Sequence, residues 1–222
     1  MGDKSTIKVL TRFSERGFHI LSILKALGYI GDKTAVPFIS QYIKGEELVV
    51  RGNAVTALGE IEDKSAVPVL LEALKDRSHF IRCRAAEALG KIKDKSAVPG
   101  LINLLEDRIR IVRLHAIWAL GEIGLDSTVE ILKELLEDSS GTIRIQAARS
   151  LAKMGDISGY DVIIESSDHH DSRIRELSIY ALQHIYTEEA VSILEKISEN
   201  DRLFKLRALA KTAVEDMKSD MK

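Results

Sequence analysis

The sequence lacks most of the features that mark a secreted, membrane-bound or nucleic-acid-binding protein. Its single cysteine, Cys83, excludes an internal disulfide framework and is typical of a reducing compartment. The net charge is only −2, so no excess of positive charge draws the chain toward nucleic acid or an anionic membrane. No apolar run approaches the roughly 18 residues that span a bilayer, and no apolar signal region follows the polar start. We therefore expect a cytoplasmic protein with no membrane partner.

Proline is also scarce, but its three residues recur at a fixed interval. Pro37, Pro68 and Pro99 lie 31 residues apart. The same step separates two further series, Gly28, Gly59, Gly90 and Gly121, and Arg51, Arg82, Arg113, Arg144 and Arg175. A period between about 20 and 50 residues is the mark of a repeat array. We divide the chain into seven repeats of a single elongated domain, 1–222, with boundaries at 1–31, 32–62, 63–93, 94–124, 125–155, 156–186 and 187–219.

Aromatic residues make up only 5% of the chain, and the pattern of aliphatic residues carries the fold prediction. In the repeat 63–93, apolar residues recur at steps of three and four, first over 67–74 and again over 81–92. This spacing predicts two helices, with Asp63 as N-cap of the first and Pro68 in its early turns. A mid-helix glycine such as Gly90 costs roughly 1 kcal/mol against alanine, so we expect it to serve close packing. No alternating pattern predicts a strand.

The repeat consensus resembles a known family. The pattern AVPxLxxxLxDxxxxxRxxAxxALGxI, seen over 66–92 and 97–123, is similar to HEAT repeats, in particular the short subclass also found in phycobilisome-lyase-type proteins. The resemblance covers nearly the whole chain. It implies an all-α fold, an α-solenoid wound as a right-handed superhelix of about seven HEAT-like helix pairs.

An aspartate at the end of the first helix, with an arginine six residues later, is the most specific part of this pattern. It is present as Asp76 and Arg82, Asp107 and Arg113, and Asp138 and Arg144. We interpret these residues as a structural ladder between stacked repeats rather than as an anion track. Arg113, in the middle of the array, is expected to be largely buried.

The sequence offers no catalytic machinery and no metal or cofactor site. His169, His170 and Asp171 are ligand-type residues but stand consecutively in a polar turn without partners at zinc spacing. Cys83 lies between Arg82 and Arg84, which could lower the pKa of its thiol, although a small packing residue is the plainer interpretation. The iron-dependent hydroxylase of the HEAT class carries His-Glu pairs, and no His-Glu dipeptide is present here. We predict no cofactor and consider an enzyme improbable.

The second helix of each repeat, called the B helix, is expected to line the concave side, with the residues one, two, five and nine positions after the arginine facing away from the core. Cys83, Ile145 and Gln146 fall on these positions, and Lys25 and Tyr29 extend the same face into the first repeat. The candidate binding residues of this concave groove are Arg84, Glu87, His115, Trp118, Arg149, Tyr180 and His184. Tryptophan, tyrosine and arginine are the side chains that most often carry binding energy at interfaces.

The leading hypothesis is a non-enzymatic scaffold or adaptor that binds a protein or peptide in this groove. The resemblance leaves two alternatives: a component resembling the phycobilin lyases that chaperones or transfers a tetrapyrrole, and a nucleic-acid enzyme resembling the HEAT-like alkylpurine glycosylases. Glu87 and Glu122 dilute the positive charge that the second alternative requires. The apolar first repeat, with Phe13, Phe18, Ile20 and Leu21, could serve as a cap or as a surface for self-association.

Overall fold

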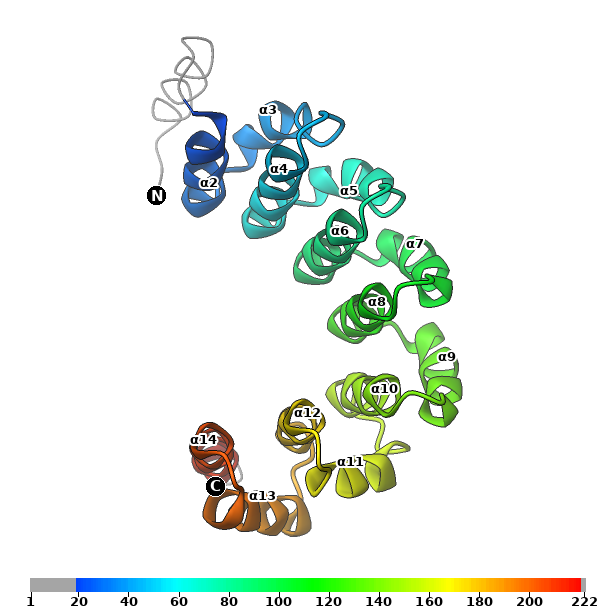
Figure 1. The fold of residues 1–222 in the computed structure, drawn as a ribbon, viewed down its shortest axis with the longest axis vertical. Coiled ribbons are helices and arrows are strands. Elements are labelled where there is room, and N and C mark those ends of the chain that lie inside the picture. Colours follow the sequence, from blue (N-terminus) through cyan, green and yellow to red (C-terminus); the bar gives the residue numbers. More distant parts are fainter. Residues whose placement is uncertain (1–18, 221–222) are drawn as a thin grey trace. The chain divides into compact units, whose positions relative to one another are not determined.

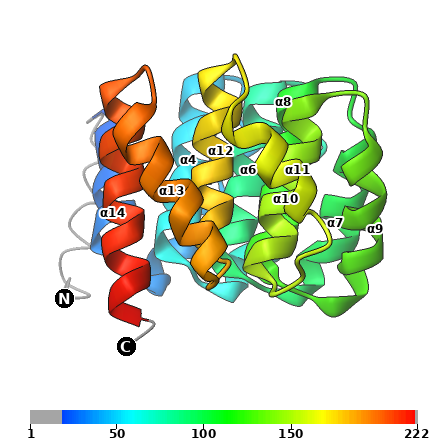
Figure 2. The same ribbon diagram turned by 90° about the horizontal axis from the view of Figure 1, so that it is seen from below.

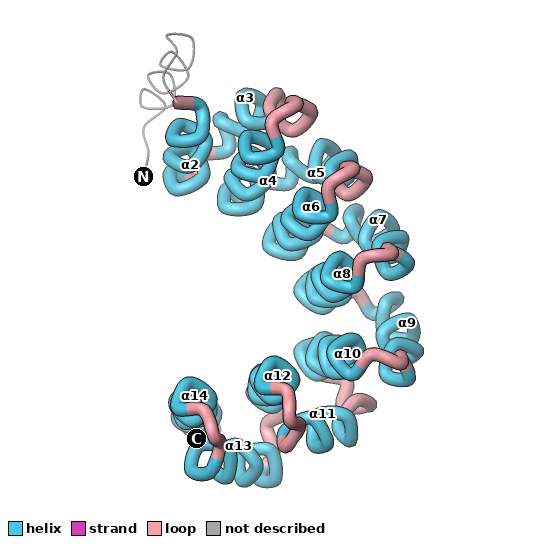
Figure 3. Tube along the Cα trace, viewed as in Figure 1, coloured by secondary structure: helices cyan, strands magenta, loops and turns pink. Residues whose placement is uncertain are grey.

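The computed structural model describes residues 19–220, and this part of the chain contains helices, turns and loops but no strand (Figure 3). The chain divides into two compact units, Met1–Ile123 and Gly124–Lys222, which are described separately below. The predicted fold class, an all-α solenoid, is confirmed. The handedness of its superhelix and the single-domain arrangement stay predictions.

Unit 1 consists of repeated pairs of a short helix A and a longer helix B (Figure 1). The A helices are α3 (Val36–Ser40), α5 (Val67–Ala73) and α7 (Val98–Asn103), and the B helices are α2 (Ile20–Ile30), α4 (Leu48–Ile61), α6 (His79–Ile92) and α8 (Arg110–Ile123). The first helix expected for repeat 1–31, with Phe13 and Phe18, lies outside the described residues.

Unit 2 continues the same alternation. Its A helices are α9 (Val129–Glu134), α11 (Tyr160–Ser167) and α13 (Glu188–Asn200), and its B helices are α10 (Gly141–Lys153), α12 (Ser172–Leu182) and α14 (Phe204–Asp220). The last pair, α13 and α14, lies side by side in Figure 2. No helix within residues 19–220 is long and apolar enough to cross a membrane. The expected cytoplasmic location stays a prediction.

Short 3-10 turns precede several A helices, a detail that the apolar pattern did not indicate. Asp63 caps such a turn, Lys64–Ala66, rather than the α-helix itself: its Oδ1 accepts a hydrogen bond from the Ser65 amide at 2.9 Å. The turn runs directly into α5, where Pro68 stands in the first turn and needs no amide partner. Asp32 and Asp94 start the preceding and following repeats in the same way.

The B helices of unit 1 form the tightly packed layer. Helix α4 packs against α2 and α6, and α6 packs against α8, whereas each A helix mainly contacts the B helix of its own repeat. Glycine permits this approach: a Cβ on Gly59 would lie 2.8 Å from the Cβ of Ala88, and one on Gly90 would lie 3.0 Å from the Cα of Ala119. The packing role expected for the recurring glycines is therefore present in this layer, which is the inner layer of the unit.

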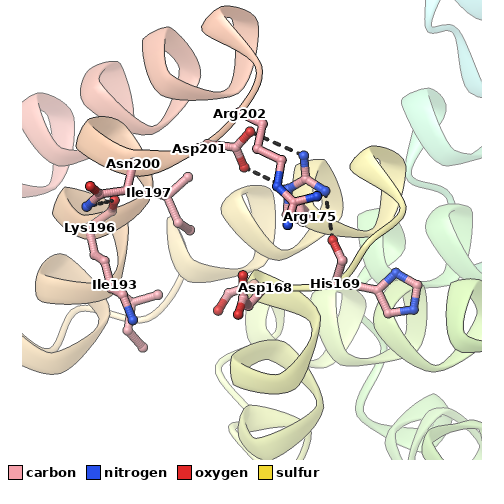
Figure 4. Close-up of a pocket in the computed structure, with 10 residues that line it drawn as sticks. Asp168, His169, Arg175, Ile193, Lys196, Ile197, Asn200, Asp201 and Arg202 are labelled. Atoms are coloured by element: carbon pink, nitrogen blue, oxygen red, sulfur yellow. Dashed lines mark hydrogen bonds and ion pairs between the residues drawn. The ribbon is translucent and has the colours of Figure 1, made fainter.

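On three of the B helices, α4, α6 and α12, an arginine joins consecutive turns. Arg82 donates from Nε and Nη2 to the two carboxylate oxygens of Asp107 in the next repeat, at 2.7 and 3.0 Å, while Nη1 donates to the carbonyl of Asp76 in its own turn at 2.9 Å. Arg51 and Asp76 repeat the arrangement in unit 1, and Arg175 and Asp201 repeat it in unit 2 (Figure 4). We call each of these arginine–aspartate pairs a rung.

The aspartate of a rung also organises its own turn. Asp107 Oδ1 accepts a hydrogen bond from the Ile109 amide at 2.8 Å. Burial alone would raise the pKa of Asp107, but the hydrogen bonds from Arg82 and Ile109, together with the charge of Arg82, outweigh it and lower this pKa. The carboxylate therefore stays ionised between the repeats.

Arg113 and Arg144 hold their own turns in the same manner. Their Nη1 atoms donate to the carbonyls of Asp107 and Asp138 at 2.8 and 3.0 Å, and Asp138 Oδ1 accepts from the Ser140 amide at 2.6 Å. Arg113 is only half-buried, so the expectation that it is largely buried was too strong. A long guanidinium stem lies along the turn, where part of it stays in contact with solvent.

Candidate functional site

The seven predicted groove residues fall into two groups. Arg84 and Glu87 lie on α6, and His115 and Trp118 lie on α8, all in unit 1; Arg149 on α10, Tyr180 on α12 and His184 in the turn just after α12 belong to unit 2. All seven are half-buried, and six of them lie on B helices. His184 was expected on a B helix as well, but α12 ends two residues before it, at Leu182. The structure describes the two groups separately, and a continuous strip through both stays a prediction.

Three residues expected on the same free face are instead buried. Cys83 is 8% exposed, Gln146 is 6% exposed, and Ile145 is fully enclosed. Burial raises the pKa of Cys83 to about 11, against the opposing charge of Arg82, so the arginines beside it do not lower this pKa, and Cys83 is a buried packing residue. The solvent-facing side of the B helices is narrower than expected, because each inner B helix is flanked by other B helices. These neighbours cover the positions next to the arginine.

The ring of Trp118 serves packing as well as the inner surface. A Cβ on Gly90 would lie 2.7 Å from Cζ3 of this ring, so the indole occupies the space that the glycine leaves on α6. Trp118 therefore contributes to the packing of α6 and α8, although it was expected to face away from the core. Burial lowers the pKa of the nearby His115, although the charge of Glu87 opposes the shift, and the imidazole is therefore neutral at pH 7.

Some charged side chains of α6 already have partners within the layer of B helices. Lys91 Nζ lies 2.8 Å from Glu60 Oε1 on α4 and 3.2 Å from Glu87 Oε1 on its own helix. Arg84 instead places its guanidinium 4.4 Å from the centre of the Phe80 ring, and its Nη1 hydrogen-bonds the Thr56 hydroxyl. In unit 2, Arg149 similarly stacks over Tyr180 at 5.2 Å.

An open groove of about 830 Å³ lies on α2, α4 and α6, and sequence reasoning found only part of it. Lys25, Tyr29 and Arg84 had been assigned to this face, but the apolar wall had not. Tyr29 is 88% exposed, Val49 is 58% exposed and Phe80 is 41% exposed. Such a concentration of exposed large apolar side chains marks an interaction surface.

The missed wall has a simple sequence signal. Val49 and Phe80 are the second residues of α4 and α6, at the same place in the repeat, and Ile111 is the second residue of α8 and is 46% exposed. Each precedes a buried residue of the core, Val50, Ile81 or Val112. Two consecutive apolar residues at a helix start cannot both face the core, so one member of each pair has to lie outside it.

The histidine-rich turn of unit 2 has a structural explanation. His169 Nδ1 accepts a hydrogen bond from the Asp171 amide at 3.0 Å. The His169 carbonyl accepts one from Arg175 Nη1 at 2.7 Å (Figure 4). These are the same two contacts that Asp76 and Asp107 make in unit 1. Within residues 19–220 no cluster of three ligand-type side chains could hold a metal ion.

Comparisons with known proteins agree with this repeat architecture. A family model described as HEAT repeats matches residues 19–82, 70–152 and 130–215. No curated protein sequence matches the chain.

Solved helical-repeat structures resemble the chain at low sequence identity. One is the complex of CpcE and CpcF of phycocyanin lyase from Nostoc sp. PCC7120, with 20% identity, a TM-score of 0.66 and coverage of 89% of this chain and 88% of that chain. Another is the archaeal HEAT-like repeats protein from Thermococcus onnurineus NA1, with 18% identity, a TM-score of 0.54 and coverage of 100% and 99%.

A designed armadillo repeat protein in complex with the peptide (KR)4 is also similar. It has 17% identity and a TM-score of 0.50, and the match covers 82% of this chain and 99% of that chain. At such identities these likenesses show a common fold.

Proposed function

Because the chain belongs to the HEAT repeat family, we propose that it is a non-enzymatic interaction module that binds a protein or peptide segment on the inner face of its B helices. The observation that carries the proposal is the groove on α2, α4 and α6, whose wall exposes Tyr29, Val49 and Phe80. Exposed aromatic and aliphatic side chains in a concave surface are the usual anchors of a protein interface.

The fold is suited to this task. Stacked helix pairs present one side chain after another along the inner layer without a specialised loop. Proteins of similar fold form the CpcE–CpcF complex and carry the peptide (KR)4, which supports the use of such a face for protein segments. Phe80 and Val49 are exposed and are not part of the buried core, so we expect their substitution to leave the helix pairs folded.

An unbiased library of random peptides tests the proposal. We expect wild-type protein to retain peptides with micromolar affinity and the variant Phe80→Ser to bind them at least tenfold more weakly. The matched control is Glu72→Ala, an exposed position on the A helix α5, which should leave binding unchanged. Far-UV circular dichroism verifies that both variants are folded. If no peptide is retained, or if both variants bind alike, the inner face of unit 1 is not the binding surface.

A further inference from the structure

The groove on α2, α4 and α6 contains an anchor that is already held in place. A Cβ on Gly52 would lie 3.0 Å from Cε1 of Phe80, so the glycine on α4 makes room for this ring. On another side the Arg84 guanidinium stacks over the ring at 4.4 Å. A side chain that is fixed before binding loses little conformational entropy when a ligand covers it. Phe80 is thus a preorganised contact for an apolar group.

The groove is lined by two cations, Lys25 and Arg84, and by one carboxylate, Glu60, which does not pair with either of them. Glu60 is bridged by Lys91 at 2.8 Å. Within residues 19–220, no carboxylate lies within ion-pair distance of Lys25 or Arg84, and the Arg84 guanidinium donates only to the Thr56 hydroxyl. The remaining donors of a guanidinium suit a carboxylate, which accepts two parallel hydrogen bonds. The groove therefore has a positive excess although the whole chain is slightly negative.

The size of the groove sets the length of its occupant. The groove crosses α2, α4 and α6, and neighbouring packed helices lie roughly 8–10 Å apart, so the two steps between them amount to roughly 18 Å. An extended chain advances about 3.3 Å per residue, which gives a segment of about six residues.

Resting on the function proposed above, we infer that this groove receives an extended acidic peptide segment of about six residues. An aromatic or large aliphatic side chain of the segment packs on the exposed Phe80 ring, in the groove that Val49 and Tyr29 also line. A neighbouring carboxylate pairs with Arg84 or Lys25. A phosphate backbone would fit less well, because the wall is apolar and Lys25 and Arg84 are the only groove cations without a carboxylate partner among residues 19–220.

The composition of the peptides retained from the random library is the first test. We expect an apolar residue flanked by Asp or Glu, and we expect a synthetic charge-reversed version of each selected peptide, with Lys and Arg, to bind at least tenfold more weakly. Retained peptides that depend on Phe80 but show no acidic bias would overturn this inference while leaving the proposed function standing. Failure of all groove-dependent binding would overturn both.

Charge reversal in the protein is the second test. Lys25→Glu and Arg84→Glu should each weaken the acidic peptides at least tenfold and improve binding of their charge-reversed versions. Lys75→Glu, with the same charge change at an exposed position outside the groove, is the control and should have little effect.

The inference is wrong if Lys75→Glu acts as strongly as the two groove variants. It is also wrong if light scattering shows a dimer that Phe80→Ser dissociates, because a second copy of the chain would then occupy the groove.

Discussion

The turn at Asp107 in unit 1 and the turn at His169 in unit 2 show which parts of a rung are separable. Both accept an amide hydrogen bond from two residues further on, and both offer a carbonyl to the arginine six residues later. Only Asp107 adds a carboxylate for the arginine 25 residues earlier, Arg82. The arginine 25 residues before His169 is Arg144, and it has no carboxylate partner within residues 124–220. A turn of this family thus forms without an acid, and the carboxylate serves the coupling between repeats.

The largest effect should come from removing an arginine that faces a carboxylate. The side chains of Arg82 and Asp107 are only 11% and 9% exposed, so Arg82→Ala strands a buried charge and should cost about 3–5 kcal/mol in the free energy of unfolding. Arg144→Ala loses only bonds to carbonyls and should cost about 1 kcal/mol. Urea unfolding measures both.

The exposed pair of Lys75 and Glu72 supplies the control for these two variants. Lys75→Ala should change the free energy of unfolding by less than about 1 kcal/mol. Equal losses for Arg82→Ala and Arg144→Ala would show that the carboxylate does not couple the repeats.

The B helices of the two units also differ at the repeat position where a B helix approaches the next one most closely. Gly59 on α4 faces Ala88 with no room for a methyl group, whereas the corresponding position of α10 holds the buried Ala152. Gly59→Ala should therefore cost about 1–3 kcal/mol through overpacking, although alanine is the better helix former. Ala152→Gly should cost only about 1 kcal/mol through helix propensity.

Gly141 is the control for Gly59, because it has space around it. Around Gly141, at the start of α10, an added Cβ would find its nearest neighbour at 3.5 Å. Gly141→Ala should be neutral or stabilising in thermal unfolding. A Gly59→Ala protein that melts like wild type would contradict the close packing of α4 and α6.

Much of this organisation could be read from the sequence, because the 31-residue period fixes which residues share a place in the repeat. It predicted the helix pairs, the glycine contacts and the positions of Asp76, Arg82 and Asp107. It did not identify His169 as the substitute for an aspartate, since only the hydrogen bond to the Asp171 amide reveals that role.

The groove was harder to predict than the fold. Apolar residues such as Val49 and Phe80 stand next to core residues and look like core in a periodic pattern. The free face beyond the arginine was overestimated for Cys83 and Ile145, because the width left between neighbouring B helices depends on how closely they pack. That distance is a tertiary property, set by contacts such as that of Trp118 with Gly90.

An aspartate in place of His169 should give the turn of unit 2 the same coupling between repeats that the turn at Asp107 has in unit 1. His169→Asp keeps an acceptor for the Asp171 amide and adds a carboxylate for Arg144, so we expect a gain of about 1 kcal/mol in the free energy of unfolding. His169→Asn supplies an acceptor without the charge and should be close to neutral. In a double-mutant cycle the gain should vanish when Arg144→Ala is also present; a gain that persists would have another origin.

The smallest effect is the response of the rungs to acid. The pKa values of Asp107 and Asp201 are lowered, because hydrogen bonds and the charges of Arg82 and Arg175 outweigh burial. Their contribution is thus complete above the unfolded-state pKa of about 3.9 and is lost as pH falls below it toward the folded-state values.

A melting experiment isolates the share of Asp107. The melting temperature of wild type should decline below about pH 4, and the decline should be shallower in Arg82→Gln, where Asp107 is no longer held ionised. Parallel curves for the two proteins would contradict this account.

The reach of a rung along the chain also has a kinetic consequence. Arg82 and Asp107 are only 25 residues apart in a chain of 222, so a rung is a local contact, and local contacts favour fast folding. Each rung closes as soon as the next turn has emerged, and no rung waits for a distant segment. Folding can therefore begin within any adjacent pair of repeats and spread outward, and it can keep pace with synthesis on the ribosome.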